Sequence, residues 1–505
     1  MTAPSATRRP RLQFALAAIL LAGVYALAVG VRLRHVDEVT LGSDALGQFL
    51  GAWTVLNGGT PVPPNPEGGH SLWVLGLPCV LGGASLADVF SLRFALGALV
   101  APLGAFAAFR LSPSRTLAWL AGALAGLTLA WDPGLVDTLV ASFRGYGAPE
   151  LVALSVAGAA LAKATHRSAR WTGMALLGAA FVGATGQHPM SAGVGLGLAV
   201  LLLAGNDRKH VVLGLCVAGL ATLPRLHWLW QLGSCGAGFL ECLGTVATGS
   251  AEPDVGRWTM LQRAFWDRGV VELGWGASLS VATGLVAAAS HRDSRWLALA
   301  GLLAVVGVLG LGLTIQGLRP YHLRAAMPVL VVAAAVGFSV RPWALAVAAA
   351  CVVFGGARLE APRGPVGDLA LVDSLGRALA ETSGSVRVEA VWFGDPVGVE
   401  PAGVVLAARQ AGMSATQLTV DEAAPVVLVV NLPDSGALPA DLPPLHPRLD
   451  PIALGAAAST RVAQFSDLAA ARAWIQRATT PPVVTGGSFD WVKAMAPEVG
   501  GYPSL

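Results

Sequence analysis

Long apolar runs separated by short polar loops recur along the first 356 residues of the chain. A transmembrane helix needs about 20 mostly apolar residues to cross a hydrocarbon layer about 30 Å thick. We predict about eleven such spans, at residues 12–31, 91–110, 115–131, 149–164, 171–187, 190–205, 211–228, 271–290, 296–315, 322–340 and 342–356. The pattern therefore predicts an α-helical polytopic membrane protein.

The pattern changes after residue 356. Residues 358–367 are rich in proline, glycine and charge, and the apolar runs that follow shrink to the length of strands. Helices are predicted at 368–382, 401–411 and 467–477, and strands at 386–392, 426–430 and 461–465. Alternating elements of this length predict a small α/β domain over residues 368–505, joined by the linker at 358–367 to a transmembrane domain over residues 1–357.

The composition agrees with a membrane location. The chain is 54% hydrophobic and 12% charged, whereas a soluble protein carries about 25% charged residues. The formal net charge is only +3, so nothing in the charge balance indicates a nucleic-acid partner.

The charges of the loops predict the orientation. One alternate set of loops is short and basic, and the other set is longer and mixed in charge. The alternation holds if residues 71–84, which include Pro78, lie on or dip into the membrane instead of crossing it. The N-terminus is then cytoplasmic, and the first loop (residues 32–90) and the C-terminal domain are extracytoplasmic.

The first external loop contains an amphipathic helix. Ser43 is a typical N-cap, Asp44 lies in the first turn, and Asn57, Gly58 and Gly59 end the helix before Pro61. Its apolar stripe consists of Leu46, Phe49, Leu50 and Trp53. We expect the stripe to lie on the membrane surface and Asp44 to face the aqueous side.

Charged residues in or beside the spans lie near the predicted outer ends, and the middles of the spans carry none. Such a distribution disfavours a coupled transporter, which usually has acids or broken helices near the midplane. It fits an enzyme that transfers a sugar from a polyprenyl phosphate, which needs a carboxylate for the acceptor and cations for the leaving phosphate. Asp44 is the candidate carboxylate.

The candidate phosphate site is the segment from residue 319 to residue 324. It offers two arginines that flank a tyrosine and a histidine, namely Arg319, Tyr321, His322 and Arg324. The ordinary alternative is that both arginines are interfacial anchors.

Further candidates are polar residues at the same predicted face: Arg144, Glu150, Glu67, His70 and His188. Glu150 is a possible second acid, and its alternative is a helix-start glutamate favoured by the helix dipole. The ordinary alternative for Glu67 and His70 is that they belong to a polar turn. The ordinary alternative for His188 is that it is a histidine at the membrane interface.

The layout resembles that of the GT-C superfamily of membrane glycosyltransferases, which use polyprenyl-phosphate sugars. The resemblance rests on a first span followed by DALGQFLGAWTVLNGGTP (residues 44–61), a short hydrophobic segment at 71–84, a second span, and YHLRAAMP at residues 321–328. It implies that Asp44 is the catalytic base and that the late motif lies near the donor phosphate. Two departures are that Ala45 replaces the second acid often found in the motif, and that only Asp132, Asp137 or Glu150 remains to supply an acid from the second external loop.

The resemblance also implies a multi-pass protein of a bacterial inner membrane, with a glycan, lipid or protein as acceptor. Some members require a divalent cation and others do not, and no ligand cluster in the sequence decides between them. Two other hypotheses are a non-catalytic GT-C-like scaffold in an envelope-assembly complex and a lipid or polysaccharide transporter.

Overall fold

The computed structural model describes most of the 505-residue chain. The described residues are 8–39, 43–56, 73–114, 116–140, 149–187, 189–203, 256–314, 320–356, 369–393, 399, 401–419, 421–432, 443–456, 459–477 and 484–485. Predictions that fall elsewhere, including the span at 211–228, lie outside this part of the chain.

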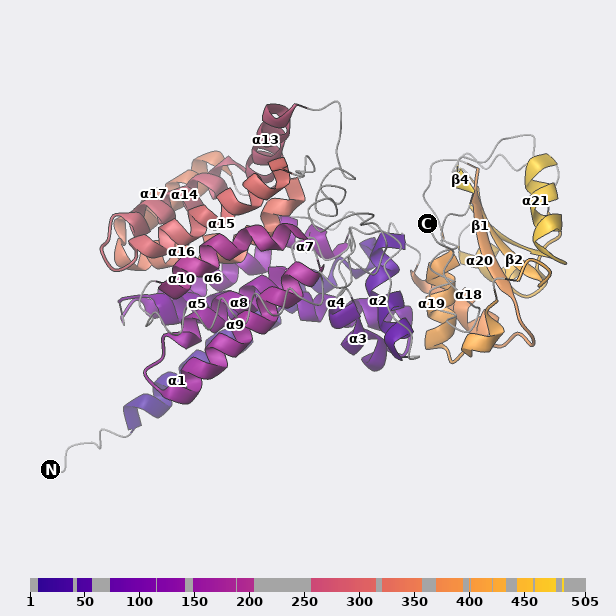
Figure 1. Ribbon diagram of the computed structural model, residues 1–505, viewed down its shortest axis with the longest axis horizontal. Coiled ribbons are helices and arrows are strands. Elements are labelled where there is room, and N and C mark those ends of the chain that lie inside the picture. The colour runs from indigo at the N-terminus through magenta and orange to yellow at the C-terminus, as the bar shows by residue number, and fades with distance from the viewer. Residues whose placement is uncertain are drawn as a thin grey trace, which may run out of the picture. The chain divides into compact units, whose positions relative to one another are not determined.

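The chain divides into two compact units. One unit comprises Met1–Arg34, Ala95–Leu139 and Gly145–Ala361, and the other comprises His35–Phe94, Val140–Arg144 and Pro362–Leu505. We call them the helical unit and the α/β unit (Figure 1). The predicted first external loop thus groups with the C-terminal segment, although about 270 residues separate them in sequence.

The helical unit is built from apolar helices joined by short turns. Its elements are α1 (Arg8–Leu33), α5 (Val100–Leu111), α6 (Ala118–Trp131), α7 (Pro133–Val140), α8 (Pro149–Ala162), α9 (Arg167–Gln187), η2 (Pro189–Val194), α10 (Gly195–Leu203), α13 (Arg257–Trp266), the π-helix η3 (Asp267–Glu272), α14 (Trp275–Ala289), α15 (Arg295–Thr314), η4 (Pro320–Ala326), α16 (Met327–Val340) and α17 (Trp343–Gly355).

Several helices are long and apolar enough to cross a membrane. Within the described residues there are four such helices, or up to five if the bent pair Arg257–Glu272 and Trp275–Ala289, with its 106° bend, counts as one span. Shorter apolar helices of 10–17 residues add to these. The chain is therefore a multi-pass α-helical membrane protein. The figure of about eleven spans stays a prediction.

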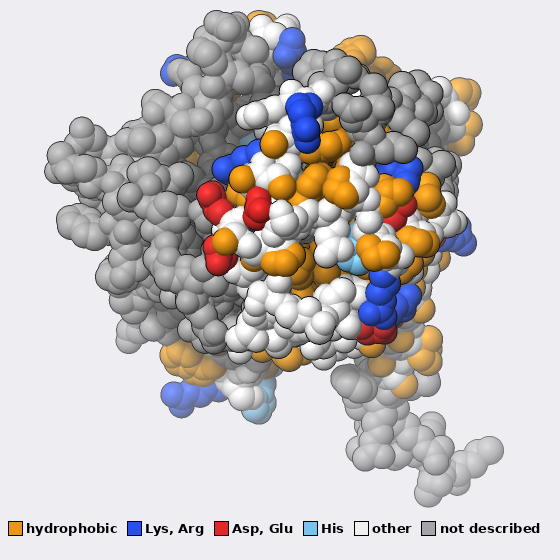
Figure 2. Space-filling view, turned by 90° about the vertical axis from the view of Figure 1, so that its right-hand side faces the viewer, with side chains coloured by type: hydrophobic (Ala, Val, Ile, Leu, Met, Phe, Trp, Pro, Cys, Tyr) orange, Lys and Arg blue, Asp and Glu red, His pale blue; other side chains and the backbone are white. Residues whose placement is uncertain are grey.

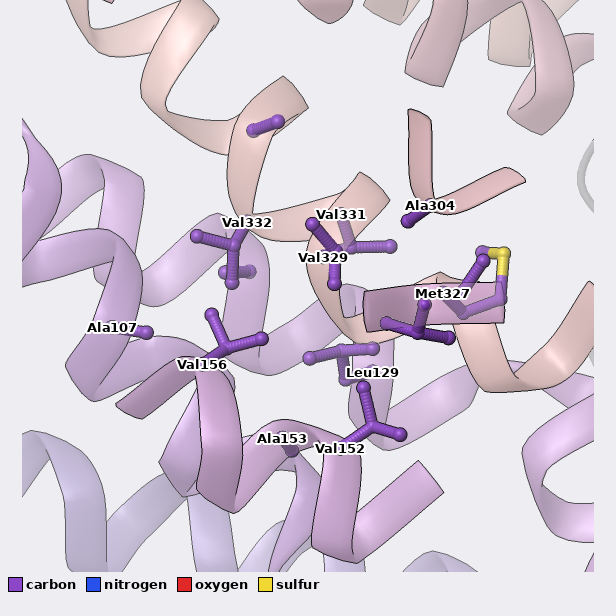
Figure 3. Close-up of a cluster of buried hydrophobic side chains, with 14 of the residues drawn as sticks. Ala107, Leu129, Val152, Ala153, Val156, Ala304, Met327, Val329, Val331 and Val332 are labelled. Carbon is purple, nitrogen blue, oxygen red and sulfur yellow. The ribbon is translucent and has the colours of Figure 1, made fainter. Parts of the chain in front are cut away.

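The core of the helical unit is made mainly of alanine, valine and leucine side chains from α5, α6, α8, α15 and α16 (Figure 3). Among the labelled residues, Val152 and Val156 of α8 lie on the same side of the cluster as Leu129 of α6, and Val329 and Val332 of α16 complete it. Small side chains let helix backbones approach closely, which matters in lipid because association there depends on packing.

The α/β unit combines two groups of elements. The first-loop group contains η1 (Val36–Glu38), α2 (Ser43–Leu56), α3 (Trp73–Gly82) and the start of α4 (Leu86–Gly97). The C-terminal group contains α18 (Leu369–Ala380), β1 (Arg387–Trp392), α19 (Pro401–Gln410), η5 (Ala415–Gln417), β2 (Val426–Asn431), α20 (Asp450–Ala456), β3 (Thr460–Phe465), α21 (Leu468–Arg477) and β4 (Val484–Thr485).

The four strands form one mixed sheet in the order β3-β2-β1-β4. β1 and β2 are parallel, with Arg387 paired to Val426, whereas β3 and β4 are antiparallel to their neighbours. All six residues of β2 are buried, as expected for a central strand covered on both faces. Trp474 of α21 packs against Phe393 and Phe465 on one face of the sheet. Figure 2 shows a face of the molecule on which hydrophobic side chains are interspersed with Lys, Arg, Asp and Glu.

The six predicted elements of the C-terminal group, α18, β1, α19, β2, β3 and α21, begin and end within one or two residues of the predicted bounds, whereas η5, α20 and β4 were not predicted. Its status as a separate domain over residues 368–505 stays a prediction. Segment 71–84 forms the ten-residue helix α3, which at about 1.5 Å per residue is half as long as a hydrocarbon core is thick.

The closest helix approach offers a test of the packing. A Cβ atom added to Gly337 of α16 would overlap the carbonyl oxygen of Gly284 in α14. We expect Gly337→Leu to lower the apparent Tm in detergent, with an overpacking cost of about 1–3 kcal/mol. Gly23→Leu in α1 is the control, because a Cβ there meets nothing within 4 Å. Equal Tm values for the two variants would contradict this packing.

Candidate functional site

Five charged side chains form one network in the helical unit. Asp132, Arg268, Glu272, Arg324 and Asp137 are joined in that order by ion pairs of 2.6–2.7 Å. They come from the α6–α7 junction, η3, η4 and α7, so the network ties together segments up to 192 residues apart. A charge is costly to bury unless it is paired, and here each charge has an opposite partner.

Asp132 is held in place by the ends of two helices. It follows the last residue of α6, and its Oδ1 accepts a hydrogen bond from the Leu135 amide of α7 at 3.2 Å, as an N-cap does. The buried Arg32 of α1 donates to the carbonyls of Leu129 and Ala130 at the end of α6, both at 3.0 Å. The break between α6 and α7 is thereby fixed, and the Asp132 carboxylate with it.

The π-helix η3 brings two of the charges together. Arg268 donates to both carboxylate oxygens of Asp132, at 2.9 and 2.6 Å, and to Oε2 of Glu272 at 2.6 Å. The Leu273 amide bonds to the Arg268 carbonyl, five residues back, instead of four. A π-helical turn is frequent at functional sites because it re-aims side chains that a regular helix would place elsewhere.

Arg324 of η4 connects the two remaining acids. It donates to Asp137 Oδ2 at 2.7 Å and to Glu272 Oε1 at 2.7 Å. Gly134 lies beneath these groups, because a Cβ added there would overlap Arg268 and Glu272 and come within 2.9 Å of Arg324 Nε. Glycine at position 134 is thus a steric requirement of the network.

Exposure differs along the network. The side chain of Asp132 is fully buried, whereas those of Glu272 and Asp137 are 18% and 31% exposed. Two guanidinium and three carboxylate groups leave one net negative charge when all are ionised. The sealed end at Asp132 is therefore structural, and the end at Asp137 and Glu272 is the part that a soluble or lipid-linked group can contact.

A cavity of about 230 Å³ adjoins the sealed end. Its polar lining residues are Thr128, Asp132 and Ser280, and the rest is lined by apolar residues, mostly of α6, α14 and α16, among them Leu124, Val281 and Met327. An apolar pocket with a few convergent polar groups is the usual form of a ligand site.

The structure brings several predicted site residues to this region. Arg324 belongs to the network, and His322 is buried in the same turn, η4. Glu150 is buried in the first turn of α8, a helix that contacts η4. Tyr321 also lies in η4, but its side chain is outside the described part.

Asp44 lies at the start of α2 in the α/β unit, and its side chain is outside the described part of the chain. The same applies to Arg319, Arg144, Glu67, His70 and His188 as whole residues. Whether Asp44 shares a cavity with Arg319 and Arg324 stays a prediction. Of the two other acids before α2, Glu38 is buried with its Oε2 3.1 Å from His35 Nδ1, and Asp37 is exposed.

The surroundings of α2 correct one expectation. Leu46 and Phe49 were expected to face lipid, but both are fully buried in protein. The Phe49 ring packs edge-on against Phe90 of α4 at 5.1 Å. Gln48, on another face of α2, is buried as well, and its Oε1 accepts from Arg93 of α4 at 3.1 Å. The side of helix α2 that carries these residues is thus covered by other elements of the α/β unit.

Sequence reasoning overlooked Arg268 and Gly134 and noted Glu272 only as a charge near the start of a span. The available signal was the four-residue spacing of Arg268 and Glu272 directly before an apolar run. Within the residues that the structure describes, no group of three or more His, Cys, Asp or Glu is placed to hold a metal ion.

The fold is that of a multi-pass α-helical membrane protein. The fold is similar to that of the crystal structure of ArnT from Cupriavidus metallidurans in the apo state, and a second ArnT structure from the same organism also matches. The apo structure is 14% identical, with a TM-score of 0.50, and the alignment covers 92% of this chain and 99% of that one. The structure bound to undecaprenyl phosphate is 14% identical with a TM-score of 0.49, covering 91% and 98%.

No family model matches the sequence. No curated protein matches it either. The likeness to ArnT is therefore a likeness of fold.

The network predicts a strong coupling between Arg268 and Asp132. Arg268→Gln leaves a buried carboxylate without its cation and should cost about 3–5 kcal/mol of stability. Asp132→Asn in the same chain should recover part of that loss. A double-mutant cycle on thermal unfolding in detergent measures the coupling.

The control is the exposed pair Arg448 and Glu381, whose side chains are 47% and 64% exposed. Exposed pairs contribute about 0–1 kcal/mol, so Arg448→Gln should barely change the apparent Tm. Additive effects of the Arg268 and Asp132 substitutions would contradict the ion pair.

Proposed function

We propose that the protein is a membrane glycosyltransferase that moves a sugar from a polyprenyl-phosphate donor to an extracytoplasmic or outer-leaflet acceptor. The observation that carries the proposal is the buried acid–arginine network at the rim of an apolar cavity in the helical unit. The cavity offers an apolar surface for an isoprenoid tail, and the network fixes η4, the turn that follows the candidate phosphate ligand Arg319. The GT-C fold and the motif at residues 44–61 support the same class.

In the proposed reaction Asp44 accepts the proton of an acceptor hydroxyl or amine. The freed electron pair attacks the anomeric carbon and forms the glycosidic bond. The bond between the anomeric carbon and the phosphate oxygen breaks, and polyprenyl phosphate leaves with that electron pair. Asp44 is well placed in the chain for this role because a helix N-terminus keeps a carboxylate ionised.

The leaving phosphate needs positive charge. Arg324 shares its charge with Asp137 and Glu272, so by itself it offers a phosphate little net attraction. We assign the main phosphate contact to Arg319, five residues before it, and assign to Arg324 the role of fixing η4, the turn that follows Arg319. The partly exposed Asp137 is then available to hold acceptor hydroxyls.

The cavity beside Asp132 is proposed to accommodate part of the isoprenoid chain. Its lining of leucine, valine and methionine matches an apolar ligand. The predicted orientation places the site on the extracytoplasmic side of a bacterial inner membrane, where the products would be a glycosylated glycan, lipid or protein.

The role of Asp44 is tested by Asp44→Asn, which keeps the size of the side chain but removes the base. Loss of a general base lowers the rate by about 10²–10⁴-fold. The assay follows release of polyprenyl phosphate by mass spectrometry from nanodiscs supplied with pentose-, hexose- and aminosugar-linked polyprenyl phosphates and an envelope extract as acceptor.

Asp37→Asn is the matched control, because Asp37 is an exposed acid seven residues earlier. It should retain the full rate. Full activity of Asp44→Asn, with or without loss in Asp37→Asn, would remove Asp44 from the mechanism.

The phosphate assignment is tested by comparing Arg319→Gln with wild type. Loss of one or two charge-assisted hydrogen bonds should raise the KM for the donor about ten- to a hundredfold, with little change in the apparent Tm. Arg324→Gln should instead lower the apparent Tm, because Glu272 and Asp137 lose a shared cation. A normal donor KM in Arg319→Gln would refute the assignment.

A further inference from the structure

Two side chains of the C-terminal group reach the turn between α3 and α4, which belongs to the first-loop group of the same unit. We call residues 83–85 the α3–α4 turn. They carry the end of α3 into the start of α4, in contact with α18 and α19. The first four amides of a helix and its last four carbonyls have no partner within the helix, so such a turn needs partners from elsewhere.

The start of α4 receives two of these partners locally. Ser85 Oγ accepts from the Asp88 amide at 3.1 Å, and Asp88 Oδ2 accepts from the Ser85 amide at 3.1 Å. This reciprocal pair is a capping box. The capping box does not bond the backbone amides of Leu86 and Ala87, the next two at the start of α4.

Those two amides are bonded by Asp373 of α18. Its Oδ1 accepts from the Leu86 amide at 2.7 Å and its Oδ2 accepts from the Ala87 amide at 3.2 Å. Asp373 is buried, and the positive end of the α4 dipole favours its negative charge. The start of α4 is therefore completed by a residue 286 positions later in the chain.

The end of α3 is completed in the same way. The side-chain amide of Gln410, the last residue of α19, donates to the carbonyls of Val80 and Gly83, at 3.3 and 3.0 Å. One turn thus receives an acceptor from α18 and a donor from α19, which together fix both helix ends that meet there.

Helix α19 also packs directly against α2. The Arg409 guanidinium lies over the Trp53 ring at 5.0 Å, and a Cβ added to Gly403 would lie 3.7 Å from Leu46 Cδ1. On its other sides α2 contacts α3 at Gly76, where a Cβ would overlap the Gln48 carbonyl, and α4 at Arg93 and Phe90. The position of α2 therefore depends on α3, α4 and α19 together.

We propose that Asp373 and Gln410 are positioning residues for the helix that carries Asp44. Asp373 and Gln410 hold the α3–α4 turn in place, and helices α3 and α4 in turn hold α2. The C-terminal group thereby contributes to sugar transfer without supplying a group that reacts. The proposal rests on the proposed function for the catalytic role of Asp44. The contacts between the two groups of elements are observed in the structure and do not depend on that function.

The test combines hydrogen exchange with kinetics on the full-length protein in nanodiscs. In Asp373→Ala and Gln410→Ala, peptides from α2 and α4 should exchange on the order of tenfold faster, the effect of a lost helix cap. The kcat for transfer should fall while the KM for the donor stays within about twofold, because the phosphate contact is assigned to Arg319. Asp373→Asn keeps one acceptor oxygen and should be intermediate in both measurements.

Asp467→Ala is the matched control, since it removes a helix cap within the C-terminal group, at the start of α21, but no contact with the first-loop group. It should speed exchange at the first turn of α21 and leave both the exchange of α2 and kcat unchanged. Unchanged exchange of α2 in Asp373→Ala and Gln410→Ala would overturn the proposal, as would faster exchange with a normal kcat.

The two ways of failing are distinguishable. If the role of Asp44 is wrong, Asp44→Asn stays active. If the positioning role is wrong, Asp44→Asn is inactive while Asp373→Ala and Gln410→Ala transfer at the normal rate.

Discussion

The arrangement of the helical unit depends on the need to neutralise charge in an apolar surrounding. Each arginine or carboxylate group that leaves water loses several kcal/mol of solvation free energy. Only a closely placed opposite charge can offset a loss of that size. Arg268 and Arg324 meet this requirement by sharing Glu272 and by binding Asp132 and Asp137. Because every member has a defined partner, η3, η4 and the α6–α7 junction have one favourable arrangement relative to one another. The same network accounts for the glycine at position 134, because a side chain there would displace Arg268 and Glu272.

Around this network the helices are held by close contact between small residues. The helical core consists largely of alanine and valine, and Gly284 and Gly337 bring α14 and α16 together. Packing of this kind fixes the cavity at Asp132 in shape, since helices that touch through backbone atoms have little room to shift. The apolar cavity and the charge network beside it are the features on which the proposed donor site is based.

The α/β unit solves a different problem, which is how to hold a short amphipathic helix that its own loop cannot bury. Helix α2 has 14 residues, near the length at which an isolated helix is marginal in water, about 12–15 residues. Its apolar side is covered by α3, α4 and α19, and the helix ends at the α3–α4 turn are bonded by Asp373 and Gln410. Helix α2 and the C-terminal sheet thus belong to one compact unit, although the membrane helices separate them in the sequence.

The sequence by itself determined the class of the protein. A run of about 20 apolar residues can satisfy all its backbone hydrogen bonds in lipid as a helix, so the membrane helices follow from local patterns. The α/β alternation after residue 356 follows from local patterns in the same way. Individual candidates such as Arg324, His322 and Glu150 were also visible, because charge beside an apolar run is informative wherever it occurs. Only the tertiary structure decided which charges meet, since a pair such as Asp137 and Arg324, 187 residues apart, leaves no periodic trace in the chain. The tertiary structure also decided that Leu46 and Phe49 face protein and not lipid. An amphipathic stripe indicates that one side of a helix is buried, but it does not indicate whether protein or lipid covers that side.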